Sequence, residues 1–395
     1  MNFNLQGYIK RQQEKNVADS LASFPVTALL GPRQCGKSTL AKHLLSQRDD
    51  AVFLDLERPS DLRKLTDPEL FFHTHRDKLI CIDEVQMGPA IFPLLRATVD
   101  DDRRPGRFFL LGSASQELIR KSSETLAGRI HYIELTPFTC TELLASSQFS
   151  REKLMELWAR GGFPESVLAV SDAISLTWRE DFIRTFLERD INQFEFSVAA
   201  QTMRRFWSML AHYHGQVMNY SKLGQALGVT HPTVKRYLEL LEQTYMVRSL
   251  APYSANIKKR LVKAPKIYLR DSGVLHALLE IDTLEDLLGH PVVGGSWEGF
   301  CIEQILAAKP NWRASFYRTS SGEEIDLILE RGQKSLAFEF KASMSPKVSR
   351  GFNATLEILQ PNHTWIIAPV PEPYPFQQNV TVSDIFSVVE EITGY

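Results

Sequence analysis

Eight consecutive residues near the N-terminus have the types and spacing of a phosphate-binding loop. Residues 31–38, GPRQCGKS, fit the pattern G-x-x-x-x-G-K-[ST] between a predicted strand and a predicted helix. In such a loop, backbone N–H groups surround a nucleotide's phosphates, the lysine contacts the β- and γ-phosphates, and the last hydroxyl binds Mg²⁺. We therefore predict a site for ATP and Mg²⁺, against the alternative of a chance match in a turn. Its predicted contact residues are Gly31, Pro32, Arg33, Gln34, Cys35, Gly36, Lys37, Ser38 and Thr39.

Two acids, a serine and an arginine would complete the chemistry begun by Lys37. The apolar run LICID ends at Asp83, which would hold Mg²⁺, and Glu84 follows, which would polarise the attacking water. Ser113 ends a later apolar run, and it would contact the γ-phosphate or that water, or else cap the next helix. Arg129 would reach the γ-phosphate of a neighbouring subunit, or else form a salt bridge. Together these residues predict ATP hydrolysis.

A second group of charged residues lies in the C-terminal part of the chain. Asp326 alternates with apolar residues along one predicted strand, and Glu339 and Lys341 alternate with them along the next. Glu298 lies on the apolar side of a predicted helix, where a carboxylate needs a metal or another cation as its partner. The alternative is a hairpin with an Asp326–Lys341 ion pair and no chemistry.

Residues 197–270 carry an excess of positive charge. They hold twelve Lys and Arg but only two acids, a formal charge of +10, whereas the whole chain carries −2. Residues 220–247 predict a helix, a turn and a second helix, followed by a hairpin wing. This winged helix-turn-helix would bind DNA, or else only pack against protein. The candidate DNA contacts are His231, Thr233, Lys235, Arg236, Lys258, Lys259 and Arg260.

The elements that must position these residues follow from the apolar pattern. Over the first 135 residues, five short apolar runs alternate with helical segments, which predicts a parallel sheet with helices on both faces. The pattern is then helical, and from about residue 271 it becomes mixed helix and strand. We predict an α/β protein of four domains. These are a P-loop ATPase core (1–138), a helical connector (139–196), a winged-helix module (197–270) and a C-terminal α/β domain (271–395).

Several segments resemble a known family. GPRQCGKSTL, LICIDEVQ, LLGSAS and LAGRIHYIELTPF resemble bacterial and archaeal AAA+ ATPases that carry a C-terminal domain of unknown function, and GGFPE, FLERDI and DSGVLHALL extend the resemblance along most of the chain. The resemblance implies ATP binding.

The C-terminal pattern Asp-x₁₂-Glu-x-Lys resembles the PD-(D/E)xK nuclease fold, although Ile325 stands where that pattern has proline. This resemblance implies that Asp326 and Glu339 bind Mg²⁺, that Glu298 assists, and that Lys341 orients a water molecule.

Two functions fit these observations. The first is an ATPase that binds DNA and couples nucleotide state to the nuclease-like domain. The second is a regulatory switch ATPase whose C-terminal half is an inert protein- or nucleic-acid-binding module. We expect ATP, DNA and further copies of the chain as partners. Four widely spaced cysteines favour a reducing cytoplasm, and the polar N-terminus and lack of a long apolar run predict neither a signal peptide nor a membrane span.

Overall fold

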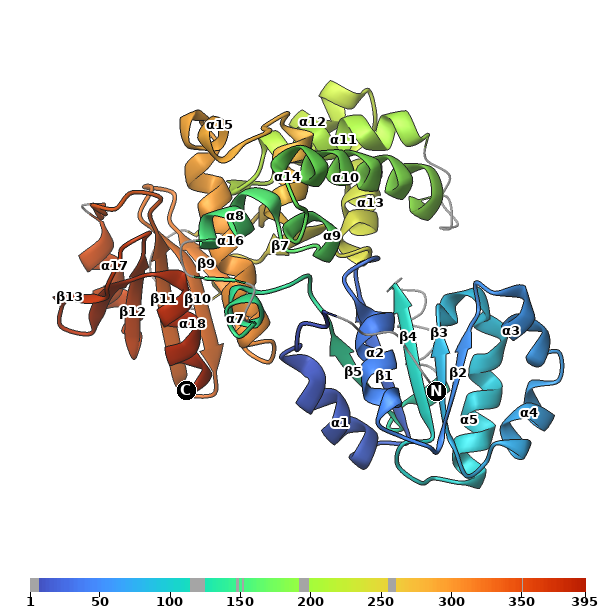
Figure 1. Ribbon diagram of the computed structural model, residues 1–395. Helices are drawn as coiled ribbons and strands as arrows, with labels where there is room; N and C mark the ends of the chain where they lie inside the picture. The colour runs from blue at the N-terminus through green and yellow to red at the C-terminus, as the bar shows by residue number, and fades with distance from the viewer. Residues whose placement is uncertain are drawn as a thin grey trace. The chain divides into compact units, whose positions relative to one another are not determined.

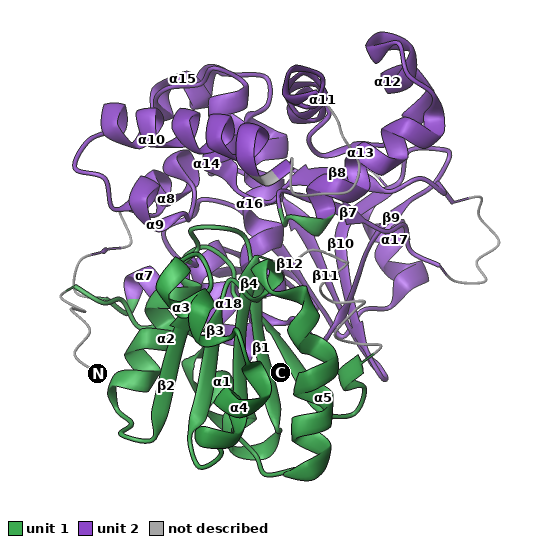
Figure 2. Ribbon diagram, turned by 90° about the vertical axis from the view of Figure 1, so that its right-hand side faces the viewer, with its two compact units in different colours: residues 1–138, 145–148, 243–245 green, residues 139–144, 149–242, 246–395 purple. Residues whose placement is uncertain are grey.

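The computed structural model describes residues 7–113, 125–146, 149–150, 153–191, 199–254, 261–349 and 351–395. The chain divides into two compact units (Figure 2). Unit 1 comprises residues 1–138, 145–148 and 243–245, and unit 2 comprises residues 139–144, 149–242 and 246–395. Each unit has its own sheet and core. The finer division of residues 139–395 into three domains stays a prediction.

Unit 1 is built on a parallel five-stranded sheet. Its strands are β1 (Val26–Gly31), β2 (Ala51–Asp55), β3 (Leu79–Asp83), β4 (Phe108–Ser113) and β5 (Ile130–Glu134). The order across the sheet is β2-β3-β4-β1-β5 (Figure 1). All five strands were predicted from their apolar runs, and the Ser113 strand lies between the P-loop strand and the Asp83 strand. The carboxyl ends of parallel strands share one edge, so Gly31, Asp83 and Ser113 lie along it.

Helices cover both faces of this sheet. They are α1 (Gln13–Ser23), α2 (Lys37–Ser46), α3 (Pro59–Lys64), α4 (Pro68–Thr74) and α5 (Phe92–Asp101), with short 3₁₀ turns η1 (Val85–Met87) and η2 (Pro89–Ile91). Alternate strand residues, such as Ala28 and Leu110, pack in one core with Phe72 of α4 and Leu95 of α5. Helices α1 and α2 contact β1. Burial on both faces explains why the strands are continuous apolar runs.

The first part of unit 2 is helical, as predicted. It contains α7 (Cys140–Leu144), α8 (Leu154–Arg160), α9 (Pro164–Val167), α10 (Asp172–Thr185), the π-helical turn η4 (Phe186–Asp190) and α11 (Ala200–His212). Helix α14 (Ser272–Leu278) packs against α8 and α10. Helices α15 (Leu284–Gly289) and α16 (Val293–Ala308) follow, and α16 carries Glu298.

The predicted helix–turn–helix is present within unit 2. Helix α12 (Tyr220–Leu227) ends at Gly228, whose φ of 70° lies in the left-handed region that glycine adopts most easily, and α13 (His231–Gln243) follows. The apolar residues of α13, including Val234, Tyr237 and Leu241, are buried as their spacing predicts. A small antiparallel sheet accompanies these helices in the order β6 (Gln216–Val217), β8 (Lys266–Leu269), β7 (Val247–Leu250). Lys258, Lys259 and Arg260 lie outside the described residues.

The C-terminal part of unit 2 is a mixed six-stranded sheet. Its strands are β9 (Arg313–Arg318), β10 (Glu324–Arg331), β11 (Lys334–Phe340), β12 (His363–Ile367), β13 (Tyr374–Gln377) and β14 (Val380–Ser383), in the order β13-β14-β12-β11-β10-β9. The predicted hairpin of β10 and β11 is confirmed, with Arg331 opposite Lys334 at the turn. Helix α17 (Phe352–Leu359) packs against β10, α16 against β11, and α18 (Ile385–Thr393) against β12. Within the described ranges, no helix has the length and apolar character needed to cross a bilayer.

Candidate nucleotide site and a buried carboxylate cluster

The loop from Gly31 to Gly36 joins β1 to α2 in a conformation that requires both glycines. A Cβ at Gly31 would stand 2.1 Å from the carbonyl oxygen of Leu135, closer than any side chain tolerates. Gly36 has a φ of 101°, which L side chains rarely adopt. Gln34 also has a positive φ, 61°. Successive backbone N–H groups in such a turn form a concave site for an anion.

Two buried charged residues stand at this loop. Lys37 is 5% exposed, and its ammonium donates to the carbonyl oxygens of Gly31 (3.1 Å) and Pro32 (2.7 Å). The Ser38 hydroxyl lies near the Asp83 carboxylate at the end of β3, close enough to lower the pKa of that carboxyl. Burial raises the pKa of Asp83, and the Ser38 hydroxyl and the Lys37 charge partly oppose that rise. A hydroxyl and a carboxylate side by side, next to a phosphate-binding loop, fit the Mg²⁺ that accompanies a nucleotide.

Glu84 and Ser113 are joined by a residue that the sequence analysis did not select. The Gln86 amide donates to the Ser113 hydroxyl over 2.9 Å and also donates to the Glu84 carboxylate. Glu84 itself has a φ of 52°, in the left-handed region, and burial raises its pKa. The available signal was a glutamine two positions after the acid, inside the quoted motif LICIDEVQ.

Arg11 is a second residue that the sequence analysis missed. It is 3% exposed, and it donates to the carbonyl oxygens of Cys35 (2.8 Å) and Thr136 (2.6 Å). Its guanidinium also lies 4.7 Å from the centre of the Phe138 ring. Arg11 therefore holds the phosphate-binding loop to the segment after β5. No local pattern marks it, because a lone arginine in a polar segment reads as a surface residue.

The other predicted nucleotide-site residues take varied positions. Arg129 pairs with Asp100 over 2.7 Å, which is the salt bridge left open as its alternative role. Arg33 pairs with Glu57 at 3.3 Å. Thr39 and Gln34 are exposed, whereas Pro32 and Cys35 are buried in the loop.

The predicted DNA-contacting side chains of α13 lie on its outer side. His231, Lys235 and Arg236 are exposed, and Thr233 is half-buried. Lys235 makes a long pair of 3.8 Å with Glu239 on the same helix. These three exposed residues lie close together in the sequence, in the N-terminal half of α13.

Two of the predicted C-terminal carboxylates, Glu298 and Asp326, lie with Glu324 around a lysine from β8, and the third, Glu339, pairs with Lys341. We call Glu298, Glu324, Asp326 and Glu339 the carboxylate cluster. The Lys266 ammonium lies 2.9 Å from Glu298, 2.5 Å from Glu324 and 3.6 Å from Asp326. Burial alone would lower the pKa of Lys266, but these carboxylates raise it above its ordinary value, so the ammonium stays charged.

The rest of the carboxylate cluster is only partly neutralised. Glu339 accepts from Lys341 over 2.7 Å, and Asp326 accepts from the backbone N–H of Phe340 over 3.0 Å. The second Glu339 carboxylate oxygen is buried and has no hydrogen-bond partner in the described part of the protein. Burial raises the pKa of both Glu298 and Glu339, and the nearby Asp326 charge raises each further. In place of the alternative Asp326–Lys341 ion pair, Asp326 lies near Lys266, and Lys341 pairs with Glu339.

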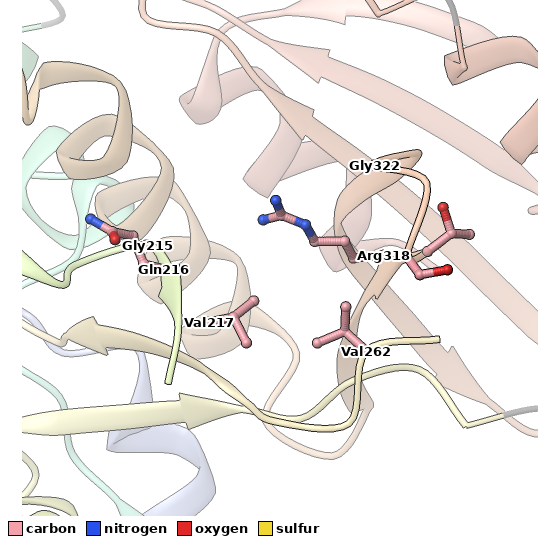
Figure 3. A pocket seen from close by; sticks show the side chains of 8 residues that line it. Gly215, Gln216, Val217, Val262, Arg318 and Gly322 are labelled. Atoms are coloured by element: carbon pink, nitrogen blue, oxygen red, sulfur yellow. The ribbon is translucent and has the colours of Figure 1, made fainter. Parts of the chain in front are cut away.

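The cluster does not fit the Mg²⁺ that the nuclease resemblance implies, because Lys266 stands among the ligands. Among the residues that the structure describes, no three His, Cys, Asp or Glu side chains are arranged to hold a metal ion. A pocket of about 500 Å³ lies beside the cluster, and Arg318, which lines it, is 3.5 Å from Glu324. Figure 3 shows Arg318 extending across this pocket toward Gly215 and Gln216.

Comparison with known proteins defines the family. The chain is 40% identical over 371 residues to the uncharacterized proteins Rv2008c of Mycobacterium tuberculosis and Mb2031c of Mycobacterium bovis, across 94% of this chain and 82% of each relative. This chain belongs to their family. Family models match an AAA domain at residues 23–144, and domains of unknown function at residues 151–285 (DUF8612) and 293–387 (DUF4143).

The family of Rv2008c therefore combines an N-terminal AAA ATPase domain with C-terminal domains of unknown function, as the resemblance implied. Among solved structures, the Walker-type ATPase paby2304 of Pyrococcus abyssi is similar to 69% of this chain and 96% of its own, with 15% identity and a TM-score of 0.49. A likeness of that strength indicates no function.

Proposed function

We propose that Lys37, Ser38, Asp83 and Glu84 make this AAA domain a Mg²⁺-dependent ATPase. The observation that carries the proposal is the contact of the Ser38 hydroxyl with the Asp83 carboxylate, beside the buried Lys37. Two segments far apart in the sequence supply these groups: residues 31–38 carry the loop and the hydroxyl, and residues 83–84 carry the acids. Their convergence at the carboxyl edge of one parallel sheet is what a metal–nucleotide site requires.

Each residue has a defined task in this proposal. Bound Mg²⁺·ATP would supply an electrophilic γ-phosphorus and a good leaving group. Lys37 would exchange its bonds to the Gly31 and Pro32 carbonyl oxygens for bonds to phosphate oxygens. Ser38 and Asp83 would hold the metal. Glu84 would accept the proton of the attacking water, and the rise of its pKa on burial favours that acceptance.

Two substitutions test these assignments. Lys37→Ala should abolish nucleotide binding, measured by equilibrium titration with a fluorescent ATP analogue. Glu84→Gln should still bind ATP but stop turnover, because an amide does not accept the proton. Normal hydrolysis by the Glu84→Gln protein would remove Glu84 from the role of base.

We propose further that α13 binds DNA. The proposal is supported by the exposed His231, Lys235 and Arg236, by the +10 charge of residues 197–270, and by an order of helices and strands that matches a winged helix. If about six phosphates were neutralised, log K would fall with log[salt] at a slope of about −5. A flat salt response would favour a protein-packing role, and Arg236→Ala should reduce the slope by about 1.

For the C-terminal half, the geometry favours the switch ATPase over the DNA-cleaving enzyme. The ammonium of Lys266 lies within 3.6 Å of two of the three predicted catalytic carboxylates, those of Glu298 and Asp326, and of the neighbouring Glu324. We therefore propose that nucleotide state in the AAA domain controls a binding module that does not cut DNA. Branched and linear DNA incubated with the protein and Mg²⁺ should stay intact. Cleavage that disappears in Asp326→Ala would establish the nuclease instead.

A further inference from the structure

We propose that the Lys266 ammonium is the resident cation of the carboxylate cluster and occupies the place of a divalent metal. The inference deepens the non-cleaving role proposed for the C-terminal half, and it involves no residue of the AAA domain. It predicts a specific conversion: removal of one positive charge at Lys266 should turn the cluster into a divalent-metal site.

The first support is the geometry around the ammonium. Its three neighbours come from two different elements, Glu298 from α16 and Glu324 with Asp326 from β10. Their carboxylate oxygens lie 2.9, 2.5 and 3.6 Å from the Lys266 nitrogen. Carboxylate oxygens converging from several sides are the ligands that Mg²⁺ and Mn²⁺ prefer, but those ions require oxygens at about 2.0–2.2 Å. An ammonium at the centre keeps a metal from making those contacts.

The second support is the rigidity of the position that carries the ammonium. Lys266 lies in β8, the central strand of its small sheet, and it is paired with Leu250 of β7 and with Val217 of β6. Its side chain is 3% exposed and also lies 5.5 Å from the centre of the Phe316 ring. A lysine held by strands on both sides does not swing out to solvent by a rotamer change alone. It is therefore a fixed part of the cluster.

The third support is the unmet charge that the cluster retains. Four carboxylates face two lysines, Lys266 and Lys341, with Arg318 near the edge at 3.5 Å from Glu324. The buried second oxygen of Glu339 has no hydrogen-bond partner in the described ranges. A buried carboxylate oxygen without a partner is costly and attracts a cation. While Lys266 stands among them, the carboxylates of the described residues are not arranged to hold a metal ion. Once Lys266 is gone, the side chains of Glu339, Asp326 and Glu298 would have room to close around one.

The pocket beside the cluster gives a route for such an ion. Its volume of about 500 Å³ exceeds that of a hydrated metal, and Gln216, Val217 and Arg318 line it. Val217 is paired with Lys266 across the strands, and Arg318 is paired with Glu324. The pocket (Figure 3) therefore lies one residue away from the cluster.

The test is a Mn²⁺ titration of the full-length protein followed by electron paramagnetic resonance, without nucleotide or DNA. Four proteins are compared: wild type, Lys266→Met, Lys266→Arg, and the double variant Lys266→Met with Asp326→Asn. Methionine keeps the length of the side chain and removes the charge, whereas arginine keeps the charge. Any weak Mn²⁺ binding at the AAA domain is the same in all four and cancels in the comparison.

We expect Lys266→Met to bind one more Mn²⁺ than wild type, at least about tenfold more tightly than any site the wild type shows. The double variant should lose that ion, and Lys266→Arg should behave like wild type. A folded Lys266→Met protein that gains no Mn²⁺ would overturn the proposal. So would a wild type that binds the same additional Mn²⁺ as Lys266→Met.

A thermal melt covers the case in which Lys266→Met is unstable. Metal that binds only the native state raises the melting temperature. Millimolar Mn²⁺ should therefore stabilise Lys266→Met and leave wild type unchanged, and the absence of that difference would also overturn the proposal. Because the assays contain neither ATP nor DNA, a failure of the proposed ATPase or DNA-binding roles would not alter either result.

Discussion

The Gln86 amide donates to the Ser113 hydroxyl across 2.9 Å and thereby links the end of β3 to the end of β4. The same amide contacts the carboxylate of Glu84, whose left-handed φ of 52° costs a non-glycine residue about 1 kcal/mol or more. The side-chain amide oxygen of Gln86 is buried and has no hydrogen-bond partner among the described residues. Gln86 therefore positions the carboxylate of Glu84, the proposed base. Its amide oxygen is a hydrogen-bond acceptor beside that carboxylate.

Gln86→Ala should release Glu84 and lower kcat about tenfold or more, with a smaller change in KM for ATP, because nucleotide contacts lie elsewhere. Steady-state ATP hydrolysis measures both constants. Gln47→Ala, which changes an exposed glutamine at the end of α2, is the matched control. An unchanged kcat in Gln86→Ala would show that Glu84 is positioned without its help.

Arg11→Ala should loosen the phosphate-binding loop. It removes the donors to the Cys35 and Thr136 carbonyl oxygens, and each buried group left unpaired costs about 1–3 kcal/mol. We expect faster amide hydrogen exchange in peptides covering residues 31–46 and weaker binding of ATP. Arg48→Ala breaks only an exposed pair with Asp50 in the same unit and should change neither. Unaltered exchange in Arg11→Ala would contradict a loop-holding role.

Buried His276 should make the stability of unit 2 depend on pH. Its ring contacts the Ala159 carbonyl oxygen and the Ser296 hydroxyl, and burial lowers its pKa to about 3. The native state keeps this ring neutral, whereas the unfolded chain protonates it below its ordinary pKa. Its contribution to the free energy of unfolding is therefore complete above about pH 6.5 and falls as the pH decreases.

The measurement compares wild type with His276→Asn by urea unfolding, followed by tryptophan fluorescence. All six tryptophans lie in unit 2, so the signal reports that unit alone. The penalty of the substitution should shrink by about 2 kcal/mol between pH 7 and pH 5. The comparison with a variant is needed because Glu298 and Glu339, whose pKa values are raised, act in the opposite direction. A penalty that is the same at both pH values would refute the prediction.

Arg129 can be tested against its ion-pair partner. If it completes a neighbouring subunit's site, Arg129→Ala should lower kcat at least a hundredfold at protein concentrations where native mass spectrometry shows assembly. Asp100→Ala breaks the same 2.7 Å pair but should leave kcat near wild type. Equal, small effects of the two substitutions would assign Arg129 to the salt bridge alone.

The parallel sheet of unit 1 was readable from the sequence because its signals are local. Each of its five strands is an apolar run of a few residues, and the glycines and Lys37 of the loop follow β1 directly. The same is true of α13, whose apolar residues recur at helical spacing, and of the β10–β11 hairpin. Strands β13 and β14 were missed because β13 is exposed and contains Pro375, so it lacks an apolar run.

The sequence by itself determined the phosphate-binding loop, the two acids and the basic helix pair, because each is defined by residues that are neighbours along the chain. Only the tertiary structure decided what stands between them. Arg11 at the loop and Lys266 among the carboxylates come from outside the pattern they complete. Gln86 lies inside a quoted motif, but its partner Ser113 is 27 residues further along the chain. The physical reason is that burial and charge pairing join residues distant along the chain. The type of a single side chain does not indicate which distant residue it will contact in the folded protein.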